Sequence, residues 1–267
     1  MGLSDVVERV RSGVLSISFL DAKDRVIAKG TGFMCNGFLV TNNHVFQGPD
    51  GSKVWIRNCF DSEVDLTQGH LLSIEDFRSA LVVGSPEENY DYAILEIAAL
   101  KNRSLYNFSL VDPKYLRVGD SVALLGFPLE HMNLTCHAGI ASSFYTRNGV
   151  DIIQVDASVN ASNSGGPMIA KDTGEVLGIV TRKATGLTNM FNQLRQNLKT
   201  NIDLVYRARQ SGGLVFINGV DPLEAVGVSQ GQMMELLGEI ERSANVGIGY
   251  VFSAKHLLEE PILTGEP

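Results

Sequence analysis

The sequence predicts an all-β protein made of antiparallel strands, with a helical insertion late in the chain. Short runs of apolar and β-branched residues, separated by turn residues, recur between residues 14 and 180. No long helical pattern separates these runs, which favours a barrel or a sandwich over a βαβ architecture. The longest region with apolar residues at helical spacing is 184–246.

The composition limits the class of protein. With 267 residues, of which 44% are hydrophobic, the chain can bury a full core as one unit or two closely packed halves. A net charge of -8 argues against a dedicated nucleic-acid binder, because phosphate contacts need a basic surface. Cys35, Cys59 and Cys136 are an odd number without metal-site spacing, and no secretory signal or membrane-spanning stretch is visible. We therefore expect a soluble, cytoplasmic protein without metal, cofactor or membrane partner.

A short helix is expected before the first strand. Asp5 and Glu8 have the spacing of a capping box, and Val6 and Val10 follow at helical spacing, so the helix should end near Gly13. The strand-like runs that follow are residues 14–19, 25–28, 32–34, 38–41, 53–56, 81–83 and 89–97.

Residues 101–117 are polar and rich in turns, which makes them the best candidate for a linker between two halves. A second set of strand-like runs follows at residues 121–125, 139–141, 151–155, 167–170 and 175–180.

Two helices are expected after this second set. Apolar residues recur at helical spacing from Met190 to Val205, and an S-x-x-Q cap at Ser229 predicts the start of the second helix. Residues 214–217 between them are compatible with a short strand, and the chain returns to β character at 247–252 before a final short helix near 254–259.

Residues 160–169 place small and turn-forming residues around the hydroxyl group of Ser164. Gly165 and Gly166 remove Cβ atoms that would block a substrate backbone, and Pro167 fixes the exit of the turn. Backbone N–H groups beside Ser164 can then face a developing oxyanion. Because serine is a weak nucleophile at its free pKa, this interpretation requires a histidine base oriented by a carboxylate.

His44 and Asp91 are the candidates for the base and the carboxylate. His44 follows the run 38–41, and Asp91 opens an alternating run. Alone, such a histidine is usually structural and such an aspartate usually caps a turn. Their occurrence in the order His, Asp, Ser on two sets of short strands favours a catalytic triad.

These motifs resemble those of the trypsin-like (chymotrypsin-fold) serine proteases, and within that fold the protease domain of the HtrA/Deg family. The matching stretches are residues 30–33, 39–45, 91–95, 154–167 and 247–251. The resemblance implies a serine endopeptidase with two six-stranded β-barrels and a triad of His44, Asp91 and Ser164 that works through an acyl-enzyme intermediate. It also implies an oxyanion hole formed by the backbone N–H groups of Ser162 and Ser164.

The resemblance divides the chain and leaves part of it unmatched. Residues 1–100 would form the N-terminal helix and first barrel, 101–117 the linker, and 118–183 with 247–258 the second barrel. Residues 184–246 form a helical insertion outside the resemblance. HtrA/Deg proteins usually continue into a PDZ domain, and we expect none here because this chain stops soon after residue 252.

A substrate pocket is also implied by the resemblance. Ser158 would form its base, and Thr181, Lys183 and Gly249 would belong to its walls. No carboxylate occurs at these positions, so a buried substrate Lys or Arg would lack a charge partner. We therefore expect small or medium apolar residues before the cleaved bond.

Ser162 departs from the family pattern, which commonly has glycine at this position. Turning its N–H into the oxyanion hole favours a positive φ, which costs a residue with a Cβ on the order of 1–2 kcal/mol. We therefore expect an enzyme that rests in a weakly active state and is activated by substrate or a partner.

Other interpretations remain open. An α/β-hydrolase would need Gly-x-Ser-x-Gly before a helix, but position 162 is serine and residues 167–170 are strand-like. Zinc binding by His131, Cys136 and His137 lacks a second pair of ligands. The main alternative is a catalytically weak trypsin fold that serves as a peptide-binding or scaffold module.

The insertion region carries a local excess of positive charge. Between residues 182 and 210, Asp203 opposes six positive residues: Arg182, Lys183, Arg195, Lys199, Arg207 and Arg209. This pattern is typical of a solvated helix face, and it is also compatible with a docking surface for an acidic regulatory partner. Self-association through the helices is a further possibility.

Overall fold

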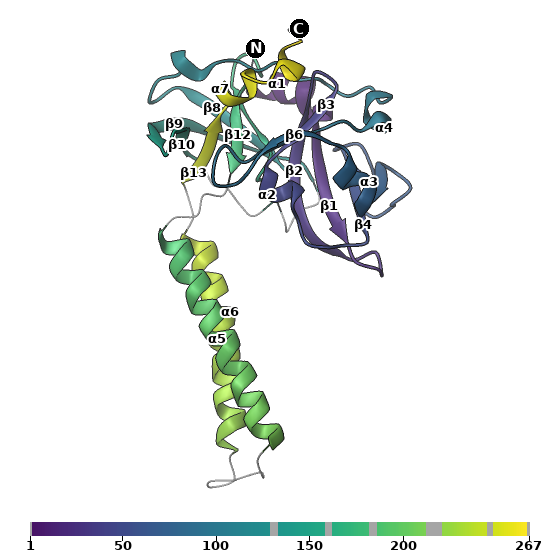
Figure 1. Cartoon of the computed structure of the whole chain (residues 1–267). Coiled ribbons are helices and arrows are strands. Elements are labelled where there is room, and N and C mark those ends of the chain that lie inside the picture. The colour runs from purple at the N-terminus through teal and green to yellow at the C-terminus, as the bar shows by residue number, and fades with distance from the viewer. Residues whose placement is uncertain are drawn as a thin grey trace. The chain divides into compact units, whose positions relative to one another are not determined.

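The computed structural model describes residues 2–128, 133–157, 162–181, 186–211, 221–244 and 248–265. The chain divides into two compact units, Met1–Arg182 with Gly247–Pro267 and Lys183–Val246. The larger unit contains the strands, and the smaller unit contains two long helices (Figure 1).

Helix α1 (Leu3–Val10) opens the chain and continues into the 3₁₀ turn η1 (Arg11–Gly13). The helix begins earlier than the Asp5 and Glu8 spacing predicts, because Asp5 itself bonds the start of the helix. Its Oδ2 accepts a hydrogen bond of 2.9 Å from the backbone N of Gly2. Val6 and Val10 are fully buried, so one face of the helix is fixed on the core.

The first half of the chain forms a seven-stranded antiparallel sheet in the order β5-β4-β1-β2-β3-β7-β6. Its strands are β1 (Val14–Leu20), β2 (Val26–Cys35), β3 (Phe38–Thr41), β4 (Lys53–Arg57), β5 (His70–Ser73), β6 (Leu81–Ser85) and β7 (Tyr92–Leu95). Three short helices join them: α2 (Asn43–Phe46), α3 (Ile74–Ser79) and α4 (Ala98–Lys101).

The second half forms a closed six-stranded barrel in the order β10-β13-β12-β11-β8-β9. It follows the 3₁₀ turn η2 (Pro113–Tyr115), and its strands are β8 (Ser121–Gly126), β9 (Thr135–Arg147), β10 (Val150–Asp156), β11 (Pro167–Ala170), β12 (Val176–Thr181) and β13 (Gly249–Ser253). The predicted all-β, chymotrypsin-like fold is thus confirmed. The first half differs in detail, because its seven strands form a half-barrel sheet and not a closed barrel of six.

Residues between the two halves bond to both of them. The Phe108 backbone N donates to Met34 O at 2.8 Å in the first sheet. Val176 N donates to Ser109 O at 2.9 Å, and Val111 N donates to Val176 O at 3.0 Å in the barrel. Part of the stretch 101–117 is therefore paired with β2 of the sheet and with β12 of the barrel.

One hydrophobic cluster joins the two halves, and each half also has a cluster of its own. The shared cluster contains Phe33 and Val40 of the sheet together with Leu125 and Ile169 of the barrel. Leu257 and Leu263 belong to the same cluster. They lie on the C-terminal helices α7 (Lys255–Leu258) and α8 (Pro261–Thr264), which fixes these helices on the body.

Helices α5 (Gly186–Ser211) and α6 (Pro222–Ala244) form the smaller unit and run side by side (Figure 1). The predicted cap at Ser229 is wrong, because α6 begins at Pro222. Asp221 Oδ1 accepts a hydrogen bond of 2.9 Å from Leu223 N, and a proline in the first turn needs no N–H partner. The strand suggested at 214–217 lies outside the described residues. In the part of the chain that the structure describes, neither helix is apolar enough to cross a membrane.

Candidate active site

Strand pairing brings His44 and Asp91 together. The end of β3 pairs with the start of β7, with Thr41 opposite Ala93. His44 lies three residues after Thr41, in the first turn of α2, and Asp91 lies two residues before Ala93. Asp91 Oδ2 is 2.7 Å from His44 Nδ1, and Asp91 Oδ1 accepts a hydrogen bond of 3.0 Å from the His44 backbone N.

The Asp91 carboxylate is buried, with 1% of the residue exposed, so it needs hydrogen-bond donors from the protein. Thr181 Oγ1 donates to Asp91 Oδ2 at 3.3 Å, in addition to the two donors from His44. Asn42 Nδ2 donates to the Asp91 backbone O at 2.8 Å and fixes the main chain, which has a left-handed φ of 48°. A histidine that donates from Nδ1 to this carboxylate leaves Nε2 able to accept a proton.

Ser164 lies in a turn that is bonded to β2 and β12. Thr31 N donates to Ser164 O at 2.9 Å, and Gly165 N donates to Val180 O at 2.8 Å. Gly165 has a φ of 87°, and a Cβ there would lie 2.1 Å from Thr31 O. A Cβ at Gly166 would lie 2.2 Å from Leu125 O. Because glycine has no Cβ, the turn at these two residues can lie directly against the backbone carbonyl groups of Thr31 and Leu125.

Ser162 adopts the left-handed conformation that its Cβ disfavours, with a φ of 76°. Its carbonyl oxygen accepts a hydrogen bond of 2.7 Å from Thr31 Oγ1. The same hydroxyl group accepts a hydrogen bond of 3.0 Å from Phe127 N, and Thr31 is fully buried. Thr31 is thus a residue of the site that sequence reasoning missed. Its position between Gly30 and Gly32, within a matching stretch, was the available signal.

The Ser164 turn and His44 are connected through Thr31. Thr41 Oγ1 donates to Thr31 O at 2.6 Å, and Thr41 lies at the end of β3, just before the helix that carries His44. Among the described residues, no hydrogen bond joins the Ser164 hydroxyl group to the His44 ring. In structures without substrate, this bond is often long and tightens only in the complex.

The predicted substrate pocket is described only in part, because Ser158 and Lys183 lie outside the described residues. Thr181 ends β12 and lies opposite Tyr250 of β13. Its hydroxyl group contacts Asp91, so this residue supports the carboxylate in addition to its place beside the predicted pocket. Gly249 opens β13, opposite Val155 of β10.

Two cations lie near the loop that follows β8. Lys29 Nζ is 5.7 Å from the centre of the Phe127 ring, and the Arg57 guanidinium is 5.4 Å from it. Burial, and then repulsion from Arg57, lowers the pKa of Lys29 to about 8. Lys29 lies two residues before Thr31 on β2, and Thr31 is bonded to Ser164, so a positive charge lies on the strand that contacts the Ser164 turn.

The residues considered for zinc do not form a described site. His131 lies outside the described residues, and Cys136 and His137 are neighbours on β9, so their side chains point to opposite faces. In the described parts of the chain, no three His, Cys, Asp or Glu side chains are placed to hold a metal ion.

Comparison with known sequences supports a relationship across the strand regions. Residues 30–179 match a family model described as a trypsin-like peptidase domain. Serine protease HTRA1A of Danio rerio is 30% identical over 229 residues, which cover 78% of this chain and 43% of that protein. A probable periplasmic serine endoprotease DegP-like of Brucella suis is 34% identical over 164 residues, covering 59% and 28%. The chain thus spans less than half the length of these relatives.

Solved structures share the fold. The HtrA-type protease AlgW with tripeptide superposes with a TM-score of 0.59 and 21% identity, covering 99% of this chain and 65% of that chain. The serine endoprotease from Yersinia pestis gives a TM-score of 0.51 and 24% identity, covering 69% and 58%.

Proposed function

The chain belongs to the trypsin-like peptidase family, as a serine protease of the HtrA type, and from this premise we propose that it hydrolyses internal peptide bonds of protein or peptide substrates. Ser164 is the nucleophile, His44 the general base and Asp91 the residue that orients the base. The observation that carries this assignment is the 2.7 Å contact between His44 Nδ1 and the buried Asp91 carboxylate.

The chemistry follows from the protonation of the His44 ring. Asp91 holds the proton on Nδ1, so Nε2 takes the Ser164 Oγ proton while Oγ attacks the carbonyl carbon of the substrate. The tetrahedral intermediate collapses when Nε2–H gives its proton to the leaving amine, and an acyl-enzyme remains. Water then attacks the acyl carbon, gives a proton to the same Nε2, and releases the acid product with restored Ser164.

The oxyanion of the intermediate would be bound by the backbone N–H groups of Ser162 and Ser164. The left-handed φ of Ser162 costs on the order of 1–2 kcal/mol, and the buried hydrogen bond from Thr31 offsets about 1 kcal/mol of this cost. The two terms are close in size. We therefore propose low basal activity that rises when a substrate or a partner at the insertion stabilises this turn.

For the pocket we propose a preference for small or medium apolar residues before the cleaved bond, with Ser158 at the base. A cytoplasmic location also remains a proposal, supported by three cysteines that form no disulfide. A reducing compartment keeps such thiols free.

Labelling with a fluorophosphonate tests the assignment, because this reagent forms a covalent bond only with an activated serine. We expect label on Ser164 in the wild-type protein, none in Ser164→Ala, and unchanged labelling in Ser121→Ala, which alters an exposed serine at the start of β8. Ser164→Ala and His44→Ala should each lower peptide turnover by several orders of magnitude, and the double variant should lose little more.

Retained turnover in either single variant would overturn the triad assignment. If the folded wild-type protein took up no label even with substrate peptides present, the peptide-binding or scaffold module would be the better description.

A further inference from the structure

The turn of Ser164 is held between a strand of the barrel and a strand of the first sheet. On the barrel side, Gly165 N donates to Val180 O of β12 at 2.8 Å. On the sheet side, Thr31 N of β2 donates to Ser164 O at 2.9 Å. The pocket predicted for the residue before the cleaved bond lies on the β12 side. The residues after that bond should therefore extend toward β2 and the strands beyond it, β1 and β4.

Two cations, Lys29 and Arg57, belong to the face of the sheet that borders this path. Side chains alternate along β2, so Lys29 shares the face from which Thr31 Oγ1 bonds the turn of the nucleophile. Ser16 of β1 is paired with Thr31 on one side and with Arg57 of β4 on the other. The same face thus carries a positive side chain on β2 and another on β4.

Lys29 lies where β2 passes from the core to solvent. Phe33, further along this face of the strand, is fully buried in the shared cluster, and Thr31 is also fully buried. At the other end of β2, Val26 and Ile27 are 45% and 46% exposed. Lys29 is half-buried between these two ends. A group in solvent can therefore approach it, whereas Thr31 can act only within the protein.

The electrostatics of this pair favour an additional anion. Burial and repulsion from Arg57 lower the pKa of Lys29 to about 8, so most of the ammonium groups are still charged at pH 7. Glu63 interacts favourably with both cations, but it offsets the shift of the Lys29 pKa only in part. A further carboxylate beside Lys29 would reduce the cost of holding two like charges near each other.

We propose that Lys29 selects substrates with an acidic side chain at the first or second residue after the cleaved bond, an inference that rests on the proposed peptidase function. Lys29 lies about 7 Å from Thr31 along β2, and two extended residues of a peptide also span about 7 Å. A carboxylate at either position can therefore reach the ammonium. The whole chain has a net charge of -8 and repels acidic peptides at long range, so accepting one requires a local cation.

Cleavage of two matched peptide pairs tests this selection. Each peptide has valine before the cleaved bond, and the members of a pair differ only in Glu or Gln, at the first residue after the bond in one pair and at the second in the other. For wild type we expect kcat/KM to be about five- to tenfold higher for the Glu peptide in at least one pair. Lys29→Met should bring this ratio to about one, and Lys29→Arg should retain it. Lys23→Met is the matched control, because it removes the same charge from an exposed residue in the turn between β1 and β2, and it should keep the ratio.

Support of the loop after β8 is the alternative role for Lys29, because its Nζ donates to Pro128 O at 3.4 Å. In that case Lys29→Met would lower the cleavage of both peptides of a pair equally, and the ratio would not change. An unchanged ratio in Lys29→Met, or equal kcat/KM for Glu and Gln peptides in wild type, would overturn the proposal.

Peptide binding to Ser164→Ala separates this inference from the proposed function, because binding needs no turnover. The preferred Glu peptide should bind about five- to tenfold more tightly than its Gln partner, and Lys29→Met in the same background should remove the difference. Equal binding of the two peptides would overturn the selection by Lys29, and normal fluorophosphonate labelling of Ser164 would then leave the peptidase function standing. If wild type took up no label, the peptidase function would fail, and the binding difference would still decide the role of Lys29.

Discussion

Ser162 lies where the resemblance to the HtrA/Deg family leads us to expect glycine, and its left-handed conformation is strained. It combines a Cβ with a φ of 76°, and its carbonyl oxygen is held by Thr31. Thr31 also accepts the backbone N–H of Phe127, so one buried side chain connects β2, the end of β8 and the turn of Ser164. The free energy of the left-handed turn therefore depends on a residue far away in sequence.

Replacing Ser162 by glycine should raise basal activity. Ser162→Gly removes the conformational cost, and about 1.4 kcal/mol corresponds to a tenfold change in a local equilibrium. We expect turnover of a short peptide to rise by up to about tenfold and the response to activators to shrink. Asn148→Gly is the matched control, because Asn148 also has a positive φ, of 53°, in the turn between β9 and β10.

The control should leave turnover unchanged. Unchanged or lower basal turnover in Ser162→Gly would contradict the proposal that the conformational cost at Ser162 limits basal activity.

At the residue scale, the sequence identifies a candidate side chain when the residues next to it in the chain form an uncommon pattern. Ser164 precedes two glycines, and His44 and Asp91 each adjoin a strand with a matching stretch, so the sequence predicts all three as a triad, and the structure brings His44 and Asp91 into contact. Thr31 was missed although it lies between two glycines in a matching stretch, because its role depends on hydroxyl partners that only the fold brings near. Thr181 was expected only as a pocket residue, and its contact with Asp91 depends on how the two halves meet.

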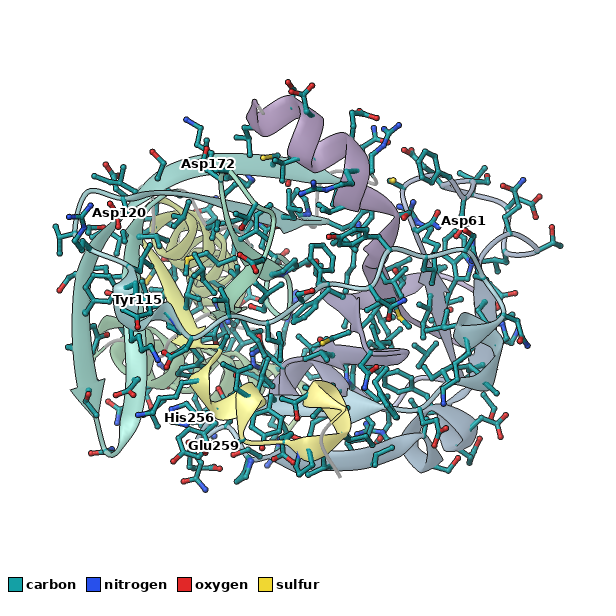
Figure 2. The ribbon with its side chains drawn as sticks, turned by 90° about the horizontal axis from the view of Figure 1, so that it is seen from above. Asp61, Tyr115, Asp120, Asp172, His256 and Glu259 are labelled. Carbon is teal, nitrogen blue, oxygen red and sulfur yellow. The ribbon has the colours of Figure 1, made fainter. Side chains whose placement is uncertain are left out.

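At the scale of elements, the C-terminal helices contact the chain on both sides of Asp91. The ring of His256 on α7 stacks on Tyr90 with the centres 3.7 Å apart, and the Tyr92 hydroxyl group donates to Glu260 before α8. Figure 2 shows His256 and Glu259 close together on this segment. Tyr90 and Tyr92 flank Asp91 in the sequence, so α7 and α8 help to hold the carboxylate in place.

Loss of the ring at position 256 should reduce both stability and catalysis. Neither ring nitrogen of His256 has a hydrogen-bond partner in the described structure, so the stacking is the contact to test. His256→Ala should cost about 1–3 kcal/mol of unfolding free energy and lower kcat several-fold with little change in KM. His256→Phe keeps an aromatic ring and should retain kcat. Equal kcat loss in both variants would contradict a role for the stacking.

The thermal stability of the wild type and that of His256→Phe should depend differently on pH. Burial lowers the pKa of His256, so on acidification the unfolded chain takes up a proton near pH 6.5 while the folded chain resists it. The stability linked to neutral His256 is therefore present above that pH and lost below it. Between about pH 7.5 and 5.5, the Tm of wild type should fall more than that of His256→Phe.

Glu259 and Asp151 act against this shift, because each raises the pKa of His256, but burial is the largest effect and Lys255 acts in the same direction as burial. Parallel Tm curves would show that His256 does not titrate differently on folding.

The bounds of a strand could be predicted where a short apolar run has turn residues on both sides. Strands β3 and β11 have the predicted bounds, because each is a short apolar run between turn residues. Strand β5 was missed, since its four residues include no β-branched side chain and only pairing with β4 defines it. Strand β9 is much longer than predicted, because it does not alternate cleanly between apolar buried and polar exposed residues: Ile140 and Phe144 are exposed.

At the scale of the whole molecule, the helical hairpin is inserted between two strands that are direct neighbours. Thr181 at the end of β12 lies opposite Tyr250 of β13, so the chain leaves and returns at adjacent points of the barrel. Replacing residues 186–245 by a short flexible loop should therefore preserve the barrel and shift its Tm by only a few degrees.

Substrate selection should change in this deletion, because the removed segment begins just after Thr181, which contacts Asp91. Cleavage of a peptide library by the two proteins, in equal amounts of labelled active site, measures the effect. An identical cleavage profile would show that the hairpin has no part in choosing substrates.

The position of β13 also has a consequence for biosynthesis. This strand follows the hairpin in the sequence, yet it lies between β10 and β12 in the barrel. While a ribosome is still making residues 183–246, the barrel therefore lacks one of its walls, and the strand opposite Thr181 has not yet been made. A chain built in this order completes its barrel only once residues 249–253 have been made, so we expect no proteolytic activity from a partly made chain that ends before β13.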